Sequence, residues 1–209
     1  MKSILALLVE DPATGLLSYS DAEIRHRNES GAVLEFVDFW KQGRGVAPKM
    51  LIFDGRFTTY QNLNKLDKSE EKIKFLTLRR RGKNLVKNAN AIADDKWQMV
   101  EVQGEKRKCR QLRVHDGRCS LRHYEGEVRQ LILTGHGRQT PVFLITNDFD
   151  IGISQLIRKY ARRWLVEQEI AEQVAFFHIN QPSSSIVLKV DFDLSISLLA
   201  HNLFRLLTS

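Results

Sequence analysis

The chain has 209 residues, of which 43% are hydrophobic and 27% are charged, and its formal net charge is +7. This composition is close to the average of globular proteins and argues against wholesale disorder. The apolar runs are far shorter than the roughly 20 residues that span a bilayer, so we expect no membrane segment. Cys109 and Cys119 lack the number and spacing of a disulfide framework or a zinc site, which fits a cytoplasmic location.

The first third of the chain is predicted to alternate strands and helices. Residues 4–9 and 16–24 read as strands joined by turn residues at 11–15, which predicts a hairpin. A helix is expected to start with Ser30 as its cap and to stop at the glycines Gly43 and Gly45.

A second group of elements places an acidic residue at a strand end. Residues 49–53 and 73–78 read as strands, and a helix capped by Thr58 or Thr59 lies between them. Strand, helix and strand over so short a distance favour a right-handed crossover and a parallel pair. Asp54 would then lie at the carboxyl end of a strand, where functional sites gather.

The rest of the chain is predicted to contain a β-rich stretch and two helices. Residues 97–134 alternate with a period of two, and residues 142–146 form another strand. A long helix is expected over residues 153–177, and a final helix from about Asp193 to Leu207.

The long helix carries Glu167 on the face that is expected to pack on the sheet. One interpretation pairs Glu167 with Arg163, one turn earlier, as an ordinary surface ion pair. The other combines Glu167 with Asp54 as ligands of a divalent metal, for which oxygen ligands suit Mg²⁺ or Mn²⁺.

Tyr160, Arg163 and Glu167 are spaced as Tyr-x2-Arg-x3-Glu on the predicted long helix. This spacing resembles the signature of the insertion-sequence-4-like DDE transposases of bacteria. Thr146-Asn147 resembles the step that precedes the signature helix, and the segment around Asp54 resembles the strand with the second catalytic aspartate. The β-rich stretch lies where the family has an insertion.

The resemblance implies an α/β, ribonuclease-H-like fold in three segments. These would be a partial core over residues 1–84, a β-rich insertion over 85–140, and the rest of the core over 141–209. Asp54 and Glu167 would be the catalytic metal ligands for two Mg²⁺ or Mn²⁺ ions, and Tyr160 and Arg163 would contact DNA. The position of the signature lysine holds Val174.

The family's first aspartate and its central strand have no counterpart in the chain, which starts at what resembles the second strand. Asp11 lies in the predicted hairpin turn and is a poor substitute. We therefore expect a fragment that is defective alone, with unpaired strand edges where the central strand would lie.

Basic segments predict contact with the backbone of double-stranded DNA, although solvated charged surfaces are the alternative interpretation. The segments contain Arg79, Arg80, Arg81 and Lys83, residues 106–110, and Arg158, Lys159 and Arg162.

Three functions therefore remain open. The first is DNA transposition at transposon ends, in a nucleoid-associated protein that forms a homodimer or a mixed dimer with full-length transposase. The second is a non-catalytic DNA-binding remnant, and the third is a nuclease on the same fold.

Overall fold

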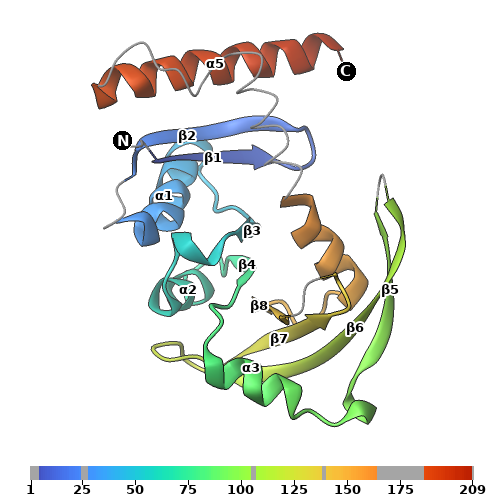
Figure 1. The fold of residues 1–209 in the computed structure, drawn as a ribbon. Coiled ribbons are helices and arrows are strands. Elements are labelled where there is room, and N and C mark those ends of the chain that lie inside the picture. Colours follow the sequence, from blue (N-terminus) through green and yellow to red (C-terminus); the bar gives the residue numbers. More distant parts are fainter. Residues whose placement is uncertain (1–4, 25–27, 105–106, 138–139, 164–185, 209) are drawn as a thin grey trace. The chain divides into compact units, whose positions relative to one another are not determined.

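The computed structural model describes residues 5–24, 28–104, 107–137, 140–163 and 186–208 (Figure 1). The chain forms two compact units, one made of residues 1–32 and 164–209 and the other of residues 33–163. These divisions differ from the three segments expected from the sequence. The predicted α/β class is confirmed, with a mixed sheet that is flanked by helices.

The first unit is a hairpin with a long helix lying along it (Figure 1). Strands β1 (Leu5–Asp11) and β2 (Leu16–Ile24) pair in antiparallel fashion, as predicted. In the turn, Asp11 Oδ1 accepts a hydrogen bond from the backbone N–H of Ala13, which confirms Asp11 as a turn residue. A short 3-10 helix, η1, covers Glu29–Gly31.

The final helix, α5, runs over Val187–Thr208. The prediction that it starts near Asp193 was wrong, because the apolar and polar residues before Asp193 continue the same helical faces. Val190 and Leu194 of α5 pack on Ala22 of β2.

The second unit is built on a six-stranded sheet with the order β3-β4-β8-β7-β6-β5. The strands are β3 (Met50–Phe53), β4 (Lys74–Leu78), β5 (Gln98–Gly104), β6 (Arg107–Ser120), β7 (Glu127–Thr134) and β8 (Val142–Thr146). As predicted, β3 and β4 are parallel, whereas the other pairs are antiparallel. The β-rich stretch is therefore not a separate module, because its strands continue the sheet that contains β3.

Helices cover both faces of this sheet. On one face, α1 (Ala32–Arg44) and α2 (Tyr60–Asp67) pack with Phe53, Phe75 and Ile145. On the same side of the sheet, α3 (Lys83–Asn90) packs against Ile132 and Phe143.

The other face is covered by a helix that is described over residues 153–163. Its predicted continuation to residue 177 lies outside the described residues. None of the described helices is long and apolar enough to cross a membrane.

Two helix boundaries differ from the expectation. Ser30 lies in η1, so it does not cap α1 directly, and α1 continues through Gly43 to Arg44. The helix ends at Gly45, whose φ of +70° is the left-handed conformation that glycine adopts at low cost. The sequence analysis did not predict α3, whose apolar residues are few and make only a short pattern.

Candidate active site

Asp54 lies directly after β3, at the carboxyl edge of the parallel β3–β4 pair, as predicted. The preceding carbonyl, that of Phe53, accepts a 2.8 Å hydrogen bond from the hydroxyl of Thr77. Thr77 is completely buried, so this bond is held away from competing water. The strand end that carries Asp54 is therefore attached to β4 through a side chain as well as through the backbone ladder.

Gly55 holds the turn after Asp54 close to the end of β4. A Cβ atom at this position would lie 2.4 Å from the carbonyl oxygen of Leu78, which is shorter than any normal contact. Only glycine lets the two backbones approach this closely. The direction in which the Asp54 carboxylate leaves the sheet is thus set by a local packing constraint.

The Asp54 side chain is half-buried and bonds locally. Its Oδ1 accepts a 3.0 Å hydrogen bond from the backbone N–H of Arg56 and caps the short 3-10 helix η2 (Gly55–Phe57). Within the part of the chain that the structure describes, this is the hydrogen bond that the carboxylate makes. Oδ2 therefore remains available to a ligand from solvent, which suits a divalent cation that prefers carboxylate oxygens.

Tyr160 and Arg163 lie together on the helix over residues 153–163. The Arg163 guanidinium carbon stands 5.3 Å from the centre of the Tyr160 ring, a cation–π arrangement between residues one turn apart. Tyr160 also packs into the apolar cluster that contains Ile52 and Leu78, which lie near the carboxyl ends of β3 and β4. The two signature residues therefore belong to the sheet face behind the Asp54 strand.

Glu167, the second predicted metal ligand, lies outside the described residues, and so does Val174. Across the described ranges no group of three or more His, Cys, Asp or Glu residues is placed to hold a metal ion. Asp54 itself fits as one oxygen ligand.

The basic residues after β4 divide into two kinds. Arg79 continues the ladder, since its backbone N–H donates to Phe143 O, and its Nη1 donates to Gln130 Oε1 at 2.6 Å. Arg81 Nη1 donates to Thr140 Oγ1. Arg80 and Lys83 are exposed.

Arg79 is not brought together with Tyr160. Side chains alternate along β4, with Leu78 in the cluster that contains Tyr160, so Arg79 belongs to the opposite face with Phe75 and Thr77. Of the four predicted DNA contacts in this segment, Arg80, Arg81 and Lys83 are exposed and Arg79 is partly buried.

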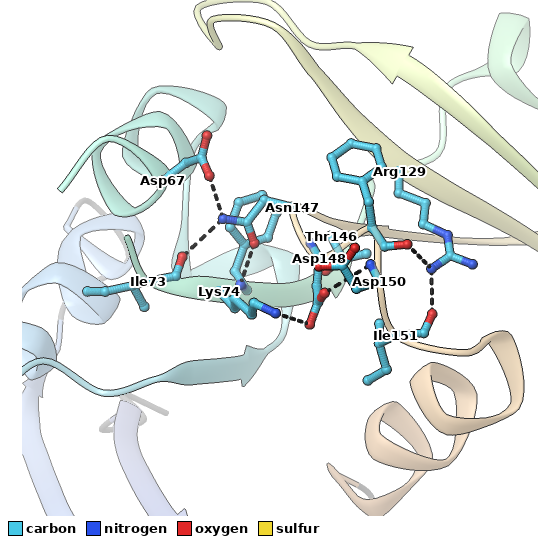
Figure 2. Close-up of polar contacts among 11 residues, drawn as sticks. Asp67, Ile73, Lys74, Arg129, Thr146, Asn147, Asp148, Asp150 and Ile151 are labelled. Atoms are coloured by element: carbon cyan, nitrogen blue, oxygen red, sulfur yellow. Dashed lines mark hydrogen bonds and ion pairs between the residues drawn. The ribbon is translucent and has the colours of Figure 1, made fainter. Parts of the chain in front are cut away.

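At the opposite end of strands β4 and β8 lies a polar network that the sequence analysis did not predict (Figure 2). Asn147 follows β8, and its Oδ1 accepts a 2.9 Å hydrogen bond from the backbone N–H of Phe75. Its Nδ2 donates to Ile73 O at 3.1 Å and to Asp67 Oδ1 at 2.7 Å. The amide of Asn147 thus takes the place of a backbone peptide and extends the β4–β8 ladder.

Asp148 and Arg129 anchor the segment that leads into the helix (Figure 2). Asp148 is buried, and its Oδ2 lies 2.9 Å from Lys74 Nζ. Arg129 pairs with Asp116 at 2.7 Å and donates to the carbonyls of Phe149 and Ile151. The hydrogen bond with Asp116 raises the pKa of Arg129 above its ordinary value. These contacts fix where the helix starts.

Tyr124 completes the network from the turn between β6 and β7. Its ring packs edge-on to Phe75, and its hydroxyl is hydrogen-bonded to Asp67. Burial, together with the negative charge and hydrogen bond of Asp67, raises the pKa of Tyr124 well above its ordinary value of 10.0. The phenol therefore stays protonated, and can donate to Asp67, to a higher pH than an ordinary tyrosine.

A separate open groove lies between β5 and the start of the helix over residues 153–163. Its volume is about 540 Å³, and its lining includes Met99, Glu101, Gln155 and Arg158. None of the predicted catalytic residues lines it. Among the residues that line the groove, Arg158 is the single cationic one, and it belongs to one of the basic segments.

The fold and this site define a mixed α/β protein with an acidic residue at the carboxyl edge of a parallel strand pair. Searches of this chain against protein-family models and against curated proteins find no match.

Proposed function

We propose that this chain is part of a DDE-type DNA transposase with a ribonuclease-H-like core, in which Asp54 and Glu167 supply two of the metal-binding carboxylates. The observation that carries the proposal is the placement of Asp54 at the carboxyl edge of β3, with Tyr160 and Arg163 on the helix that covers the same sheet. Two-metal phosphoryl transfer needs the metal-binding acids and the signature residues to lie at the same end of the strands.

The sheet topology supports a common location for the two halves of the signature. Because β8 is antiparallel to β4, the chain leaves β8 at the edge opposite Asp54. A helix that starts there and packs on the sheet runs back across it. Its 11 described residues rise about 16 Å, roughly the length of a five-residue strand. Tyr160 and Arg163, at the end of the described part of this helix, then lie toward the strand ends that carry Asp54.

Each residue has a distinct role in this proposal. Asp54 and Glu167 would hold Mg²⁺ or Mn²⁺, and the bound metal would activate a water or a 3′-hydroxyl at the scissile phosphate. Arg163 would bind a phosphate oxygen near the cut, held in position by the Tyr160 ring. Arg80 and Lys83 would bind the DNA backbone at a distance from the chemistry.

The position of β3 supports a third carboxylate on a neighbouring strand. In the described part of the second unit, β3 is the terminal strand and pairs with β4 alone. A strand that added to the outer edge of β3 would bring its side chains next to Asp54. The chain alone is therefore expected to bind metal weakly and to give little or no product.

The test compares the chain expressed with and without the coding region immediately upstream. We expect Mg²⁺-dependent cleavage of terminal-repeat DNA only with the upstream region, and no cleavage in the Asp54→Asn or Glu167→Gln variant. Clear product from the chain alone would contradict the expected defect. Cleavage that survives Asp54→Asn would reject the proposed site.

DNA binding is expected for all three functions, and the reaction products separate them. Duplex DNA should bind the chain alone, with an affinity that falls steeply as salt rises. Arg80→Ala combined with Lys83→Ala should reduce the salt slope by roughly 2. Binding without cleavage under every condition would favour the non-catalytic DNA-binding protein, whereas hydrolysis without strand transfer would favour a nuclease.

A further inference from the structure

Strand β5 is, like β3, a terminal strand of the six-stranded sheet, and its outer backbone edge is open. Over residues 98–102 its register with β6 is regular, and a shift follows only after Val102. These residues include no proline or lysine, which commonly block pairing at a sheet edge, and Glu101 is the one charged side chain among them. Within the described ranges no strand or loop pairs with this edge. The edge is therefore a template for one more strand.

The open groove described above runs along this edge, between β5 and the first turns of the helix over residues 153–163 (Figure 1). Residues 98–101 of β5 all line it. Since neighbouring side chains of a strand point to opposite faces, a run of consecutive lining residues means that the groove follows the strand backbone. Four residues of strand extend about 13 Å. The volume of about 540 Å³ lies within the range of roughly 300–1,000 Å³ that is usual for ligand sites, so a short extended peptide has room there.

The side chains beside the groove predict the pattern of a strand that would bind there. On the face covered by the helix, Val100 is buried in the apolar cluster that Ile153 also joins. On the other face Met99 is 62% exposed, and Glu101 is exposed as well. An added strand would continue this alternation, with apolar side chains beside Val100 and Ile153 on the helix side.

Arg158 sets the charge on the helix side of the groove. Its Nε donates a 3.4 Å hydrogen bond to Ser154 O, which holds the guanidinium over the first turn of the helix. Arg158 is exposed and pairs with no carboxylate among the described residues, so its terminal nitrogens can donate to one from a ligand. The N-terminal end of the helix adds positive partial charge on the same side. An acidic side chain on the helix-facing side of an added strand is therefore complementary to this wall.

Two other occupants match the groove less well. Phosphate oxygens of DNA only accept hydrogen bonds, whereas a strand edge presents carbonyl acceptors as well as N–H donors. The carboxylate of Glu101 in the lining also repels phosphate. Strand β5 of a second copy would place Gln98, Val100 and Val102 on the helix side, and none of these is an acid for Arg158.

We propose that this groove binds an extended segment of a partner protein, which pairs with β5 as an added strand and directs a Glu or Asp side chain to Arg158. Backbone hydrogen bonds along the strand supply the affinity, and the acid with its flanking apolar residues supplies the specificity. Both walls of the groove belong to the second unit, so the site is complete within it. This inference does not depend on the proposed catalytic function, because none of the predicted catalytic residues lines the groove.

The test titrates the full chain into three fluorescently labelled peptides, Thr-Val-Thr-Glu-Thr-Val-Thr and its counterparts with Gln or Lys in place of Glu. Threonine and valine favour the extended conformation. Fluorescence anisotropy should show the Glu peptide binding about fivefold more tightly than the Gln peptide, and the Lys peptide binding most weakly. Arg158→Glu should reverse the order of the Glu and Lys peptides, which a loss of folding cannot do. Arg122→Glu is the matched control, because Arg122 is exposed in the turn between β6 and β7, and it should leave the order unchanged.

Two further measurements test the pairing with β5. Binding of the Glu peptide should slow amide hydrogen exchange at residues 98–102 and leave β3, the other terminal strand, unchanged. Alternate N–H groups of the peptide face β5, so N-methylation of its second and fourth residues and of its third and fifth residues should have unequal effects. One pair should weaken binding by ~10-fold or more, because two hydrogen bonds are lost, and the other should have little effect.

Three results would overturn the proposal: no binding of any of the three peptides, equal losses from the two N-methylated pairs, or binding that leaves exchange at residues 98–102 unchanged. Slowed exchange at these residues on addition of duplex DNA, or at high concentration of the chain alone, with no effect of the Glu peptide, would also reject it. Those results would assign the groove to nucleic acid or to a second copy of the chain.

Discussion

Polar side chains lie at both ends of strands β3, β4 and β8, and the two ends differ in how these side chains are bonded. At one edge the Asp54 carboxylate is half-exposed and bonds to the backbone N–H of its neighbour Arg56. At the other edge Asn147 and Asp148 are buried, and their polar atoms meet partners from β4, α2 and the chain after β8. The two places look alike in the sequence, since in each a polar residue directly follows an apolar strand.

The difference shows which polar residues maintain the fold and which remain available to a ligand. A buried amide or carboxylate whose bonds are all satisfied cannot exchange them for a ligand without cost. A carboxylate with a free oxygen at a strand end can bind a cation with little rearrangement. Both Asp54 and Thr146-Asn147 contribute to the resemblance to one transposase family, yet their physical roles in the fold are distinct.

The largest expected effect is on catalysis. In the preparation that includes the upstream region, Asp54→Asn should lower cleavage by ~1000-fold or more, because a charged ligand is lost where charge develops. Its melting temperature should stay near the native value, since asparagine can still accept the Arg56 hydrogen bond. Asp148→Asn should do the reverse and cost roughly 1–3 kcal/mol of stability while cleavage persists. Equal losses of cleavage activity in the two variants would show that Asp54 and Asp148 do not have these separate roles.

The next largest effect concerns Asn147. Asn147→Ala should lower the free energy of unfolding by about 2–4 kcal/mol, because it leaves the buried N–H of Phe75 and the carbonyl of Ile73 without partners. Urea denaturation measures this loss. Asn64→Ala is the control, since Asn64 accepts one exposed hydrogen bond from Glu125 N and should cost about 1 kcal/mol or less. Similar losses for the two variants would argue against the ladder role of Asn147.

A smaller effect is expected at the turn that follows Asp54. Gly55→Ala should cost about 1–3 kcal/mol, because the added methyl collides with Leu78 O and pushes the turn away from β4. Gly82→Ala is the matched control, since a Cβ there meets nothing within 4 Å. Thermal denaturation of both variants provides the comparison. A stable Gly55→Ala protein would show that the two backbones are less closely packed than the structure has them.

The smallest effect is the pH dependence of Tyr124. A phenol with a raised pKa in the folded state contributes stability that is fully present below its unfolded pKa, near 10, and is lost as pH rises further. The native chain should therefore lose stability above about pH 10 relative to Tyr124→Phe, which should itself be about 1 kcal/mol less stable at neutral pH. Parallel pH profiles for the two proteins would indicate that neither burial nor Asp67 raises the pKa of the hydroxyl.

Local patterns were sufficient to predict most strands and several helices. The hairpin, the parallel β3–β4 pair and the Thr59 cap of α2 were confirmed, and so was the strand over residues 142–146. Each is specified by neighbours within a few residues. Helix α3 was missed because Leu85, Val86 and Ala89 make a short apolar pattern whose burial depends on Ile132 and Phe143.

The candidate site was predictable only in part. The position of Asp54 after a parallel strand follows from local order, whereas the roles of Thr77 and Gly55 depend on contacts with the neighbouring strand. Arg79 looked like a DNA contact, but alternation along β4 directs it to the face opposite Tyr160. A run of like charges does not reveal which side chains share a face.

The amino-acid sequence by itself determined the α/β class, the order of most of its strands and helices, and the place of Asp54 at a strand end, because these depend on periodicity and turn chemistry. Only the tertiary structure decided that the β-rich stretch continues the sheet of β3 and that Asn147 is a ladder residue. It also decided which side of α5 faces the hairpin. Strand order and hydrogen-bond partners join residues far apart in the chain, so no local pattern encodes them.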